Sequence, residues 1–430
     1  MLTLIMGEKP YSSPNNLRSF SVDPNGNALT TYGDTATLDA FGRLRISNPV
    51  TLFDSQQQYN DNPLTWGTTL TGSGTSTHLP NESSVRMRCT TASGDKVVRQ
   101  THKYFRYQSG KSLLLIMTGV MGALKTNTRQ RIGYFDANNG IFFEQDGTNL
   151  KVVRRTFTSG AAVDNAVNQS SWNIDKMDGT GISGITLDMS KSQIFLIDIE
   201  WLGVGRVRMG VVIDGKIYYC HQFLNANNLS LVYMTTANLP LRYELENTGT
   251  SVSTTDLIQI CQTVISEGGF ELTRGIHHSA NSGTTSIAVT TRRAVLTIRP
   301  KATFNSISNR GLIVPEDINT LVTTNNALIE IVYNGTLGGT PSWTSAGSNS
   351  IVEYDVAGTT VTGGEIISSY YIAAGSGNNA NVLKSGLAVS VVTALALNFD
   401  GTTQDTFSVV VTSMSGTANI TTSVDWFEIY

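Results

Sequence analysis

The sequence predicts an all-β protein, and three observations support this prediction. Short apolar runs alternate with turn residues at the spacing that is typical of the strands of a β-sandwich or barrel. No segment combines capping residues with a 3.6-residue apolar period over the length of a helix. Glycine is abundant, with 40 residues in a chain of 430, which suits many tight turns. We expect an extended N-terminal arm at residues 1–50, a β-sandwich domain at residues 51–300 and a second, smaller β-sandwich domain at residues 301–430.

The first part of the chain has the composition of an arm. Pro10, Pro14, Pro24 and Pro49 prevent long regular elements, and only residues 38–47 have the pattern of a short strand pair. Such an arm cannot bury its own surface, so we expect it to pack on another domain or another subunit. The opening residues, MLTLIMGEKP, lack the basic region of a secretory signal peptide. We therefore expect a protein that folds in a reducing cytosol.

The predicted sandwich domain begins with a series of strands joined by turns. We expect strands at residues 84–89, 96–100, 102–107, 112–118, 131–135, 141–144, 150–155 and 257–264. The turns between them are rich in Asn, Asp and Gly, the residues that adopt positive φ most easily. Residues 172–184 form a loop before the most informative segment of the chain.

That segment, IFLIDIEWLGVGRVRMGVVIDGKIYYCHQF at residues 194–223, predicts three consecutive strands. Asp214-Gly215 lies between two apolar runs, the strongest signal for a type I′ hairpin turn. A three-residue loop at 203–205 makes the other turn, which places Glu200 opposite Arg208 and turns Trp201 to the core. The opposite face is then polar and carries Asp198, Glu200, Arg206, Arg208, Tyr219 and His221.

The predicted second domain has a low charge density and is also composed of strands. Within it we expect strands at residues 327–333, 350–355, 366–372, 387–397, 406–412 and 425–429, with one helical turn at residues 314–320. Two more strands, at residues 284–289 and 294–298, are expected to pair in the transitional segment that precedes this domain.

Composition excludes several functions. The net charge is −3, with 30 basic and 33 acidic residues, so no basic excess indicates nucleic acid. No apolar run reaches the ~20 residues of a membrane-spanning helix. Cys89, Cys220 and Cys261 are too few and too widely spaced for a disulfide framework or a zinc site. No Walker A motif and no nucleophile-elbow motif occurs, and we expect no cofactor.

Three further segments could have either a purely structural role or a role in metal binding. His277-His278 lies in a Ser-, Asn- and Gly-rich loop without a Cys or acidic ligand at metal spacing, so an exposed or interface pair is expected. Residues 136–140 (DANNG) and 175–181 (DKMDGTG) contain oxygen donors for calcium but complete no EF-hand loop. Turn formation is the commoner role of such residues, and the sequence does not decide whether calcium binds.

The strand LIDIEWLG at residues 196–203 resembles concanavalin-like jelly rolls, which include laminin-G-type modules, legume-type lectins and β-glucanase-like retaining glycosidases. In those glycosidases a Glu-x-Asp-x-Glu strand carries the nucleophile and the acid/base on one face. Here Asp198 and Glu200 match, but Leu196 occupies the nucleophile position. Leucine cannot attack an anomeric carbon. The resemblance implies a concanavalin/laminin-G-like jelly-roll sandwich without glycosidase activity, and we expect the chain not to be an enzyme.

The polar face has two interpretations. In one it is structural, and Glu200 forms a cross-strand ion pair with Arg208. In the other it contacts glycan. The residues expected to bind glycan are Asp198, Glu200, Arg208, Tyr219 and His221.

Three stretches, DAFGRLRISNPVTLFDSQQQY at residues 39–59, RQTHKYFRYQSGKSLLLIMTGV at 99–120 and IDIEWLGVGRVRMGVVIDGK at 197–216, resemble structural proteins of tailed bacteriophages. This resemblance implies a non-enzymatic virion part, a capsid-decoration or fibre subunit made in the bacterial host cytoplasm. Its partners would be other copies of itself, most simply in a homotrimer, and capsid or tail components. The alternative is a receptor-binding adhesin that recognises host surface glycan through the face around Glu200. We expect neither nucleic acid nor membrane as a partner.

Overall fold

The computed structural model describes residues 48–271, 275–375 and 394–430, together with five backbone segments at 6–7, 18–19, 21–22, 28–29 and 380–381. The chain divides into two units, Met1–Asn48 and Pro49–Tyr430. In the first unit the described strands are β1 (Met6–Gly7) paired with β2 (Arg18–Ser19), and β3 (Ser21–Val22) paired with β4 (Ala28–Leu29). The strand pair expected at residues 38–47 lies outside the described residues.

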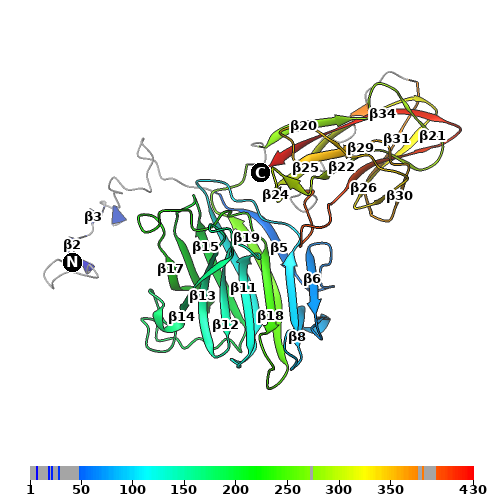
Figure 1. The fold of residues 1–430 in the computed structure, drawn as a ribbon. Coiled ribbons are helices and arrows are strands. Elements are labelled where there is room, and N and C mark those ends of the chain that lie inside the picture. The colour runs from blue at the N-terminus through cyan, green and yellow to red at the C-terminus, as the bar shows by residue number, and fades with distance from the viewer. Residues whose placement is uncertain are drawn as a thin grey trace. The chain divides into compact units, whose positions relative to one another are not determined.

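Two antiparallel sheets form the first sandwich of the second unit (Figure 1). The eight-stranded sheet has the order β17 (Lys216–Phe223), β16 (Val207–Ile213), β15 (Gln193–Glu200), β10 (Ser112–Met121), β19 (Thr255–Ser266), β8 (Ser84–Cys89) and β7 (Thr75–Leu79), with β5 (Val50–Gln56) also paired to β19. The seven-stranded sheet has the order β14 (Val163–Asn168), β13 (Asn149–Thr156), β12 (Gly140–Asp146), β11 (Thr128–Phe135), β18 (Leu241–Asn247), β9 (Lys96–Thr101) and β6 (Trp66–Thr71). The only helices in the described part of the chain are two 3₁₀ turns, Pro80–Glu82 and Gln169–Ser171.

The core of this sandwich follows from the two-residue period of its strands. On β10 buried and partly buried residues alternate along the whole strand, and on β15 the side chains of Phe195, Ile197 and Ile199 belong to the core. The facing sheet contributes Ile132 and Phe143 among others. Burial of these apolar side chains, at about 25 cal/mol per Å² removed from water, is the main term that stabilises the sandwich.

The second sandwich is built from the C-terminal part of the chain. Its five-stranded sheet contains β20 (Ile276–Asn281), β21 (Ile287–Val289), β34 (Ala418–Ile429), β25 (Leu312–Thr324) and β32 (Ala380–Asn381). Its six-stranded sheet contains β28 (Thr344–Ser345), β29 (Val352–Asp355), β22 (Arg293–Pro300), β33 (Phe407–Ser413), β26 (Ala327–Tyr333) and β31 (Glu365–Ile372). Two small ribbons complete it, β23 (Thr303–Phe304) with β24 (Ile307–Ser308) and β27 (Thr336–Gly338) with β30 (Thr360–Thr362).

The predicted fold class is confirmed: the described chain is all-β, with a jelly-roll sandwich followed by a second β-sandwich. The expected boundary at residue 301 differs from the pairing, because β20, β21 and β22 pair with strands of the C-terminal sheets. The change from one pair of sheets to the other therefore falls between Ser266 and Ile276. The sequence can indicate where a strand begins and ends, but the sheet to which the strand belongs depends on partners that are distant in the chain. The domain boundary was therefore harder to predict than the strands themselves.

Two predicted elements are wrong. Residues 102–107 form no strand beyond an isolated bridge at Phe105. Residues 314–320, expected as a helical turn, belong to the long strand β25. Pro315 is accommodated there because a bulge in the pairing with β34 follows it. Most of the strand expected at 387–397 lies outside the described residues.

The three-strand segment differs from the prediction by one shift of register. The Asp214-Gly215 turn is confirmed, with φ of 51° and 75°. However, the residue opposite Arg208 is Asp198, where Glu200 was expected. The backbone amide of Glu200 donates instead to the carbonyl of Arg206. The connection covers residues 201–206, longer than expected. Because the shift is two residues, each side chain of β15 and β16 keeps its predicted face, and Trp201 packs against the core as predicted.

Candidate functional site

The centre of the predicted polar face is a cross-strand ion pair between β15 and β16. Asp198 and Arg208 are directly opposite each other. The Nε of Arg208 donates to Asp198 Oδ2 at 2.8 Å, and one Nη donates to the same oxygen. Asp198 is buried and Arg208 is half-buried, so the strands hold this pair in place at the floor of the face.

Tyr219 of β17 completes this cluster. Its hydroxyl lies 3.5 Å from Asp198 Oδ2 and donates to it, and its ring lies under the guanidinium of Arg208, 4.4 Å from ring centroid to Cζ. Burial and the negative charge of Asp198 raise the pKa of Tyr219. Partial burial disfavours the charge on Arg208, but the hydrogen bonds that Arg208 donates to Asp198 outweigh it and raise the pKa of the guanidinium. Arg208 therefore stays cationic and Tyr219 stays protonated at neutral pH.

A polar pocket of about 300 Å³ lies above this cluster. Its lining residues are Gly110, Lys111, Ser112, Asp198, Glu200, Leu202, Arg206, Arg208 and Glu267. Three are cations (Lys111, Arg206 and Arg208) and three are anions (Asp198, Glu200 and Glu267). The pocket is thus rich in donors and acceptors but has no net charge.

Part of this lining comes from strands that are distant in sequence. Ser112 of β10 pairs with Glu200 of β15, and its hydroxyl donates to Glu267 at 2.7 Å. The sequence did not identify Lys111, Ser112 or Glu267 as site residues. The pairing of β10 with β15 joins segments that are about 80 residues apart, and no local pattern in the sequence indicates it. The apolar run that follows Ser112 is the signal in the sequence for a strand that begins there.

The loop between β15 and β16 is fixed by its own hydrogen bonds. Gly205 donates to the carbonyl of Trp201 at 2.7 Å, and Asn225 donates to the carbonyl of Gly205 at 2.6 Å. A Cβ atom at Gly205 would lie 2.2 Å from the Glu200 carbonyl oxygen, so this position requires glycine. The loop holds Glu200 and Arg206 at one rim of the pocket.

His221, predicted to share the polar face, is not part of it. Opposite the step from Met209 to Gly210 of β16, strand β17 has a bulge with Cys220 as the extra residue, and this sets His221 opposite the core residue Met209. The ring is buried, contacts Phe223 edge-on and accepts a hydrogen bond at Nδ1 from the Asn173 amide at 3.3 Å. Burial lowers the pKa of His221 to about 4. The prediction failed because a bulge reverses the alternation beyond it.

In the two stretches considered for calcium, residues 136–140 and 175–181, aspartate carboxylates bind nearby backbone amides. Asp136 accepts hydrogen bonds from the amides of Asn138 and Asn139, and Asp175 accepts them from Met177 and Ser183. These carboxylates therefore hold turns, which is the commoner role expected of them. In the described ranges no group of three or more His, Cys, Asp or Glu residues is arranged to hold a metal ion.

His277 and His278 lie on β20, not in a loop. His278 stacks on Trp426, with 6.3 Å between ring centroids, and the His277 ring lies 3.8 Å from that of Phe427. Both histidines are thereby explained as cross-strand packing partners of β34.

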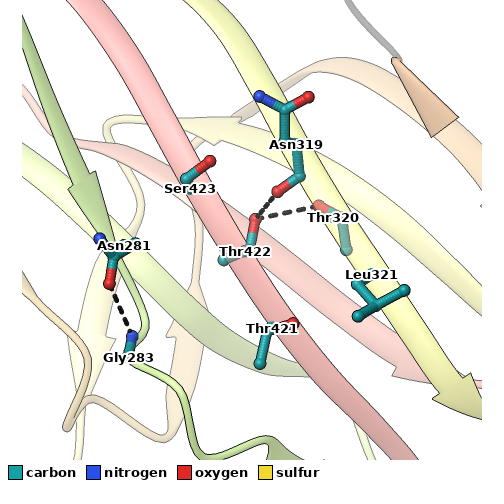
Figure 2. Close-up of a pocket in the computed structure, with 8 residues that line it drawn as sticks. All are labelled: Asn281, Gly283, Asn319, Thr320, Leu321, Thr421, Thr422 and Ser423. Atoms are coloured by element: carbon teal, nitrogen blue, oxygen red, sulfur yellow. Dashed lines mark hydrogen bonds between the residues drawn. The ribbon is translucent and has the colours of Figure 1, made fainter. Parts of the chain in front are cut away.

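A shallow pocket of about 230 Å³ lies on the outer face of β34 and β25 (Figure 2). Its polar groups bond to one another: the hydroxyls of Thr320 and Thr422 lie 2.9 Å apart, and Asn281 accepts from the Gly283 amide at 3.0 Å. It has no charged or aromatic lining residue. The pocket at Asp198 and Arg208 therefore has the more distinctive chemistry.

The part of the chain that the structure describes contains no helix of the length and hydropathy needed to cross a membrane.

No family model and no curated protein sequence matches the chain. Several solved structures are similar to it. A glycoside hydrolase family protein from Mycobacterium thermorestibile is 12% identical, with a TM-score of 0.36, and the match covers 50% of this chain and 99% of that one. The β-glucanase of Bacillus licheniformis is 12% identical, with a TM-score of 0.31 and coverage of 49% and 96%. Peanut lectin is 10% identical, with a TM-score of 0.30 and coverage of 51% and 98%.

Proposed function

We propose that this chain is a non-enzymatic binding protein whose pocket around Asp198 and Arg208 takes a saccharide unit of a surface glycan. The observation that supports this proposal best is the Asp198–Arg208–Tyr219 cluster at the floor of a 300 Å³ polar pocket. A sugar hydroxyl both donates and accepts hydrogen bonds, and the pocket supplies cationic donors and carboxylate acceptors in equal number.

The balance of charge favours a polyol over a polyanion. Three cations and three anions line the pocket, so its field does not concentrate phosphate or nucleic acid. The rim, formed by Glu200, Arg206 and Leu202, is exposed, which leaves the pocket accessible to one residue of a longer chain.

The same geometry favours binding without hydrolysis. The carboxylate oxygen Oδ2 of Asp198 already accepts hydrogen bonds from Arg208 and Tyr219, so these protein contacts occupy it instead of a reacting group. Leu196 takes the place on β15 where a second carboxylate would be needed for a retaining mechanism. We therefore expect no glycosidase activity.

Binding of the full chain to an array of bacterial surface polysaccharides and their oligosaccharides tests this proposal. Arg208→Ala should weaken binding to the recognised glycan by about tenfold or more, because hydrogen bonds to charged groups contribute about 1.5–3 kcal/mol. The matched control is Arg88→Ala. Arg88 forms the same kind of cross-strand pair with Asp256 in the same sheet, at 2.6 Å, but does not line the pocket.

Arg208→Ala leaves Asp198 without its partner, so a second variant is needed. Glu200→Gln changes only the exposed rim and should reduce glycan binding while the free energy of unfolding stays unchanged. The proposal is wrong if no glycan binds, or if the Arg208 and Arg88 variants bind equally well. Glycan hydrolysis that disappears in the Glu200→Gln variant would show instead that the protein is an enzyme.

A second candidate function is that of a structural part of a tailed bacteriophage virion. The resemblance of the stretches within residues 39–216 supports it, and it is compatible with glycan binding, since an adhesin of a virion would carry out both roles. Electron microscopy of intact particles with an antibody against this chain tests it. Labelling of the head or the tail is the expected result, and absence of the chain from purified particles would contradict it.

A further inference from the structure

The C-terminal sandwich contains a second polar pocket, of about 420 Å³. The residues that carry its chemistry are Arg299, Asn334, Trp343, Asn398, Gln404 and Asp405. They come from β22, from the turn after β26, and from two connecting segments. The volume lies in the range of about 300–1,000 Å³ that is typical of small-ligand sites.

Trp343 is the most unusual residue of this pocket. It is half-buried, whereas another tryptophan, Trp426, belongs to the described core of this sandwich. The guanidinium of Arg299 stacks on the Trp343 ring, 3.6 Å from its centroid, and donates through Nε to Glu353 at 2.7 Å. A large aromatic side chain that is held in place outside a core is a feature of ligand-binding surfaces.

Two carboxylates fix the walls of the pocket, that of the buried Asp355 and that of the half-buried Asp405. Asp355 accepts from the Ser342 amide at 2.5 Å and from the Gly358 amide at 2.7 Å, which secures the segment that carries Trp343. On the other side, Asp405 accepts from the Tyr333 hydroxyl at 2.8 Å and from Asn334 at 2.9 Å. The pocket is therefore preorganised, which lowers the entropy cost of binding.

We propose that this pocket is a second binding site, and that its ligand is a pyranose unit of a carbohydrate. The apolar C–H face of a pyranose ring can pack against an indole ring, while its hydroxyls need the mixed donors and acceptors that Asn334, Asn398 and Gln404 supply. A phosphate is disfavoured. Among the described lining residues Arg299 is the one cation, it is paired with Glu353, and Asp405 contributes a negative wall.

This inference is independent of the pocket at Asp198. Its test is a titration of the full chain with the methyl glycosides of glucose, galactose, mannose and N-acetylglucosamine, followed by tryptophan fluorescence and by calorimetry. At least one glycoside should change the fluorescence. Trp343→Ala should weaken its binding by about tenfold, and Trp343→Phe should retain most of it, because phenylalanine preserves the stacking face.

Two further variants make the result decisive. Tyr371→Ala removes another aromatic side chain of the same sandwich, 71% exposed and outside the pocket, and should leave binding unchanged. Gln404→Ala should weaken binding without removing an aromatic ring, which covers the case in which Trp343→Ala does not fold. Arg208→Ala should leave this signal intact, so failure of the first site and failure of the second are distinguishable. Absence of binding, or equal binding by the wild type and the Trp343→Ala and Gln404→Ala variants, would overturn the proposal.

Discussion

Leu196 is 1% exposed although it projects from the outer face of β15. Its neighbour across the ladder on β16 is Gly210, which has no side chain, and on the other side it pairs with Ile116 of β10. A Cβ atom at Gly210 would lie 2.4 Å from the Tyr218 carbonyl oxygen, so this position needs glycine for close approach. Leu196 is thus a buried apolar residue next to the polar pocket.

Leu196→Glu should destabilise the protein by several kcal/mol, because it buries a carboxyl group where a leucine packs. It should also produce no glycosidase activity. Urea unfolding monitored by circular dichroism measures the first effect, and release of reducing sugar from β-glucan measures the second. The matched control is Ile194→Glu on the same face of the same strand. Ile194 is 36% exposed, so this change should cost less than about 1 kcal/mol. Equal stability of the two variants would contradict the assigned burial of Leu196.

His221 provides a pH test at the residue scale. Burial lowers its pKa from the usual 6.5 to about 4, so between these values the unfolded chain binds a proton that the folded chain does not. Its contribution to stability is therefore complete above about pH 6.5 and is lost as the pH falls toward about 4. His221→Gln should reduce this pH dependence of the unfolding free energy, which denaturant titrations at a series of pH values will measure. Parallel curves for the wild type and the variant would show that His221 is not buried in the neutral form.

At the scale of elements, the outer face of the seven-stranded sheet carries a ladder of charge. Glu244, Arg131, Glu144 and Lys151 are consecutive cross-strand partners on β18, β11, β12 and β13, with alternating sign. Arg131 donates to Glu144 at 2.6 Å and to Glu244 at 2.9 Å. Despite the burial of Glu244, its cationic neighbours hold the pKa of this carboxyl well below its usual range. The ladder ties four strands together through side chains.

Arg131→Ala should cost about 3–5 kcal/mol, because it removes the cation that lies between two buried carboxylates, Glu144 and Glu244. Arg129→Ala is the matched control, since it lies two residues away on the same face of β11 and pairs with Glu246. The side chain of Arg131 is 6% exposed and that of Arg129 is 31% exposed, so the control should cost at most about 1 kcal/mol. Chemical denaturation measures both. A loss at Arg131 no larger than that at Arg129 would mean that the ladder does not act as a buried network.

At the scale of the whole molecule, the sequence predicts self-association. We expect a homotrimer that depends on the N-terminal arm, because a chain with an arm that cannot bury its own surface gains most from closed symmetry. Analytical ultracentrifugation of the full chain should give the mass of a trimer, and deletion of residues 1–48 should give a monomer. The deletion ends at the boundary of the unit Met1–Asn48. A monodisperse monomer of the full chain would contradict this prediction.

The sequence by itself determined the all-β class, the core-facing rows of β15 and β16, and the Asp214-Gly215 turn. Each depends on residues that are close in the chain: alternation assigns a side chain to a face, and two residues with positive φ define a hairpin. It also placed Asp198, Arg208 and Tyr219 on one polar face, because a register shift of two residues preserves the alternation.

Only the tertiary structure decided which side chains share a site. The pairing of β10 with β15 brings Ser112 and Lys111 to Glu200, and a bulge at Cys220 of β17 moves His221 away from the face. The pocket at Trp343 likewise joins segments that are far apart in sequence. Such neighbours are fixed by the packing of the whole chain, since the free energy that selects one strand as the partner of another comes from a core to which all strands contribute.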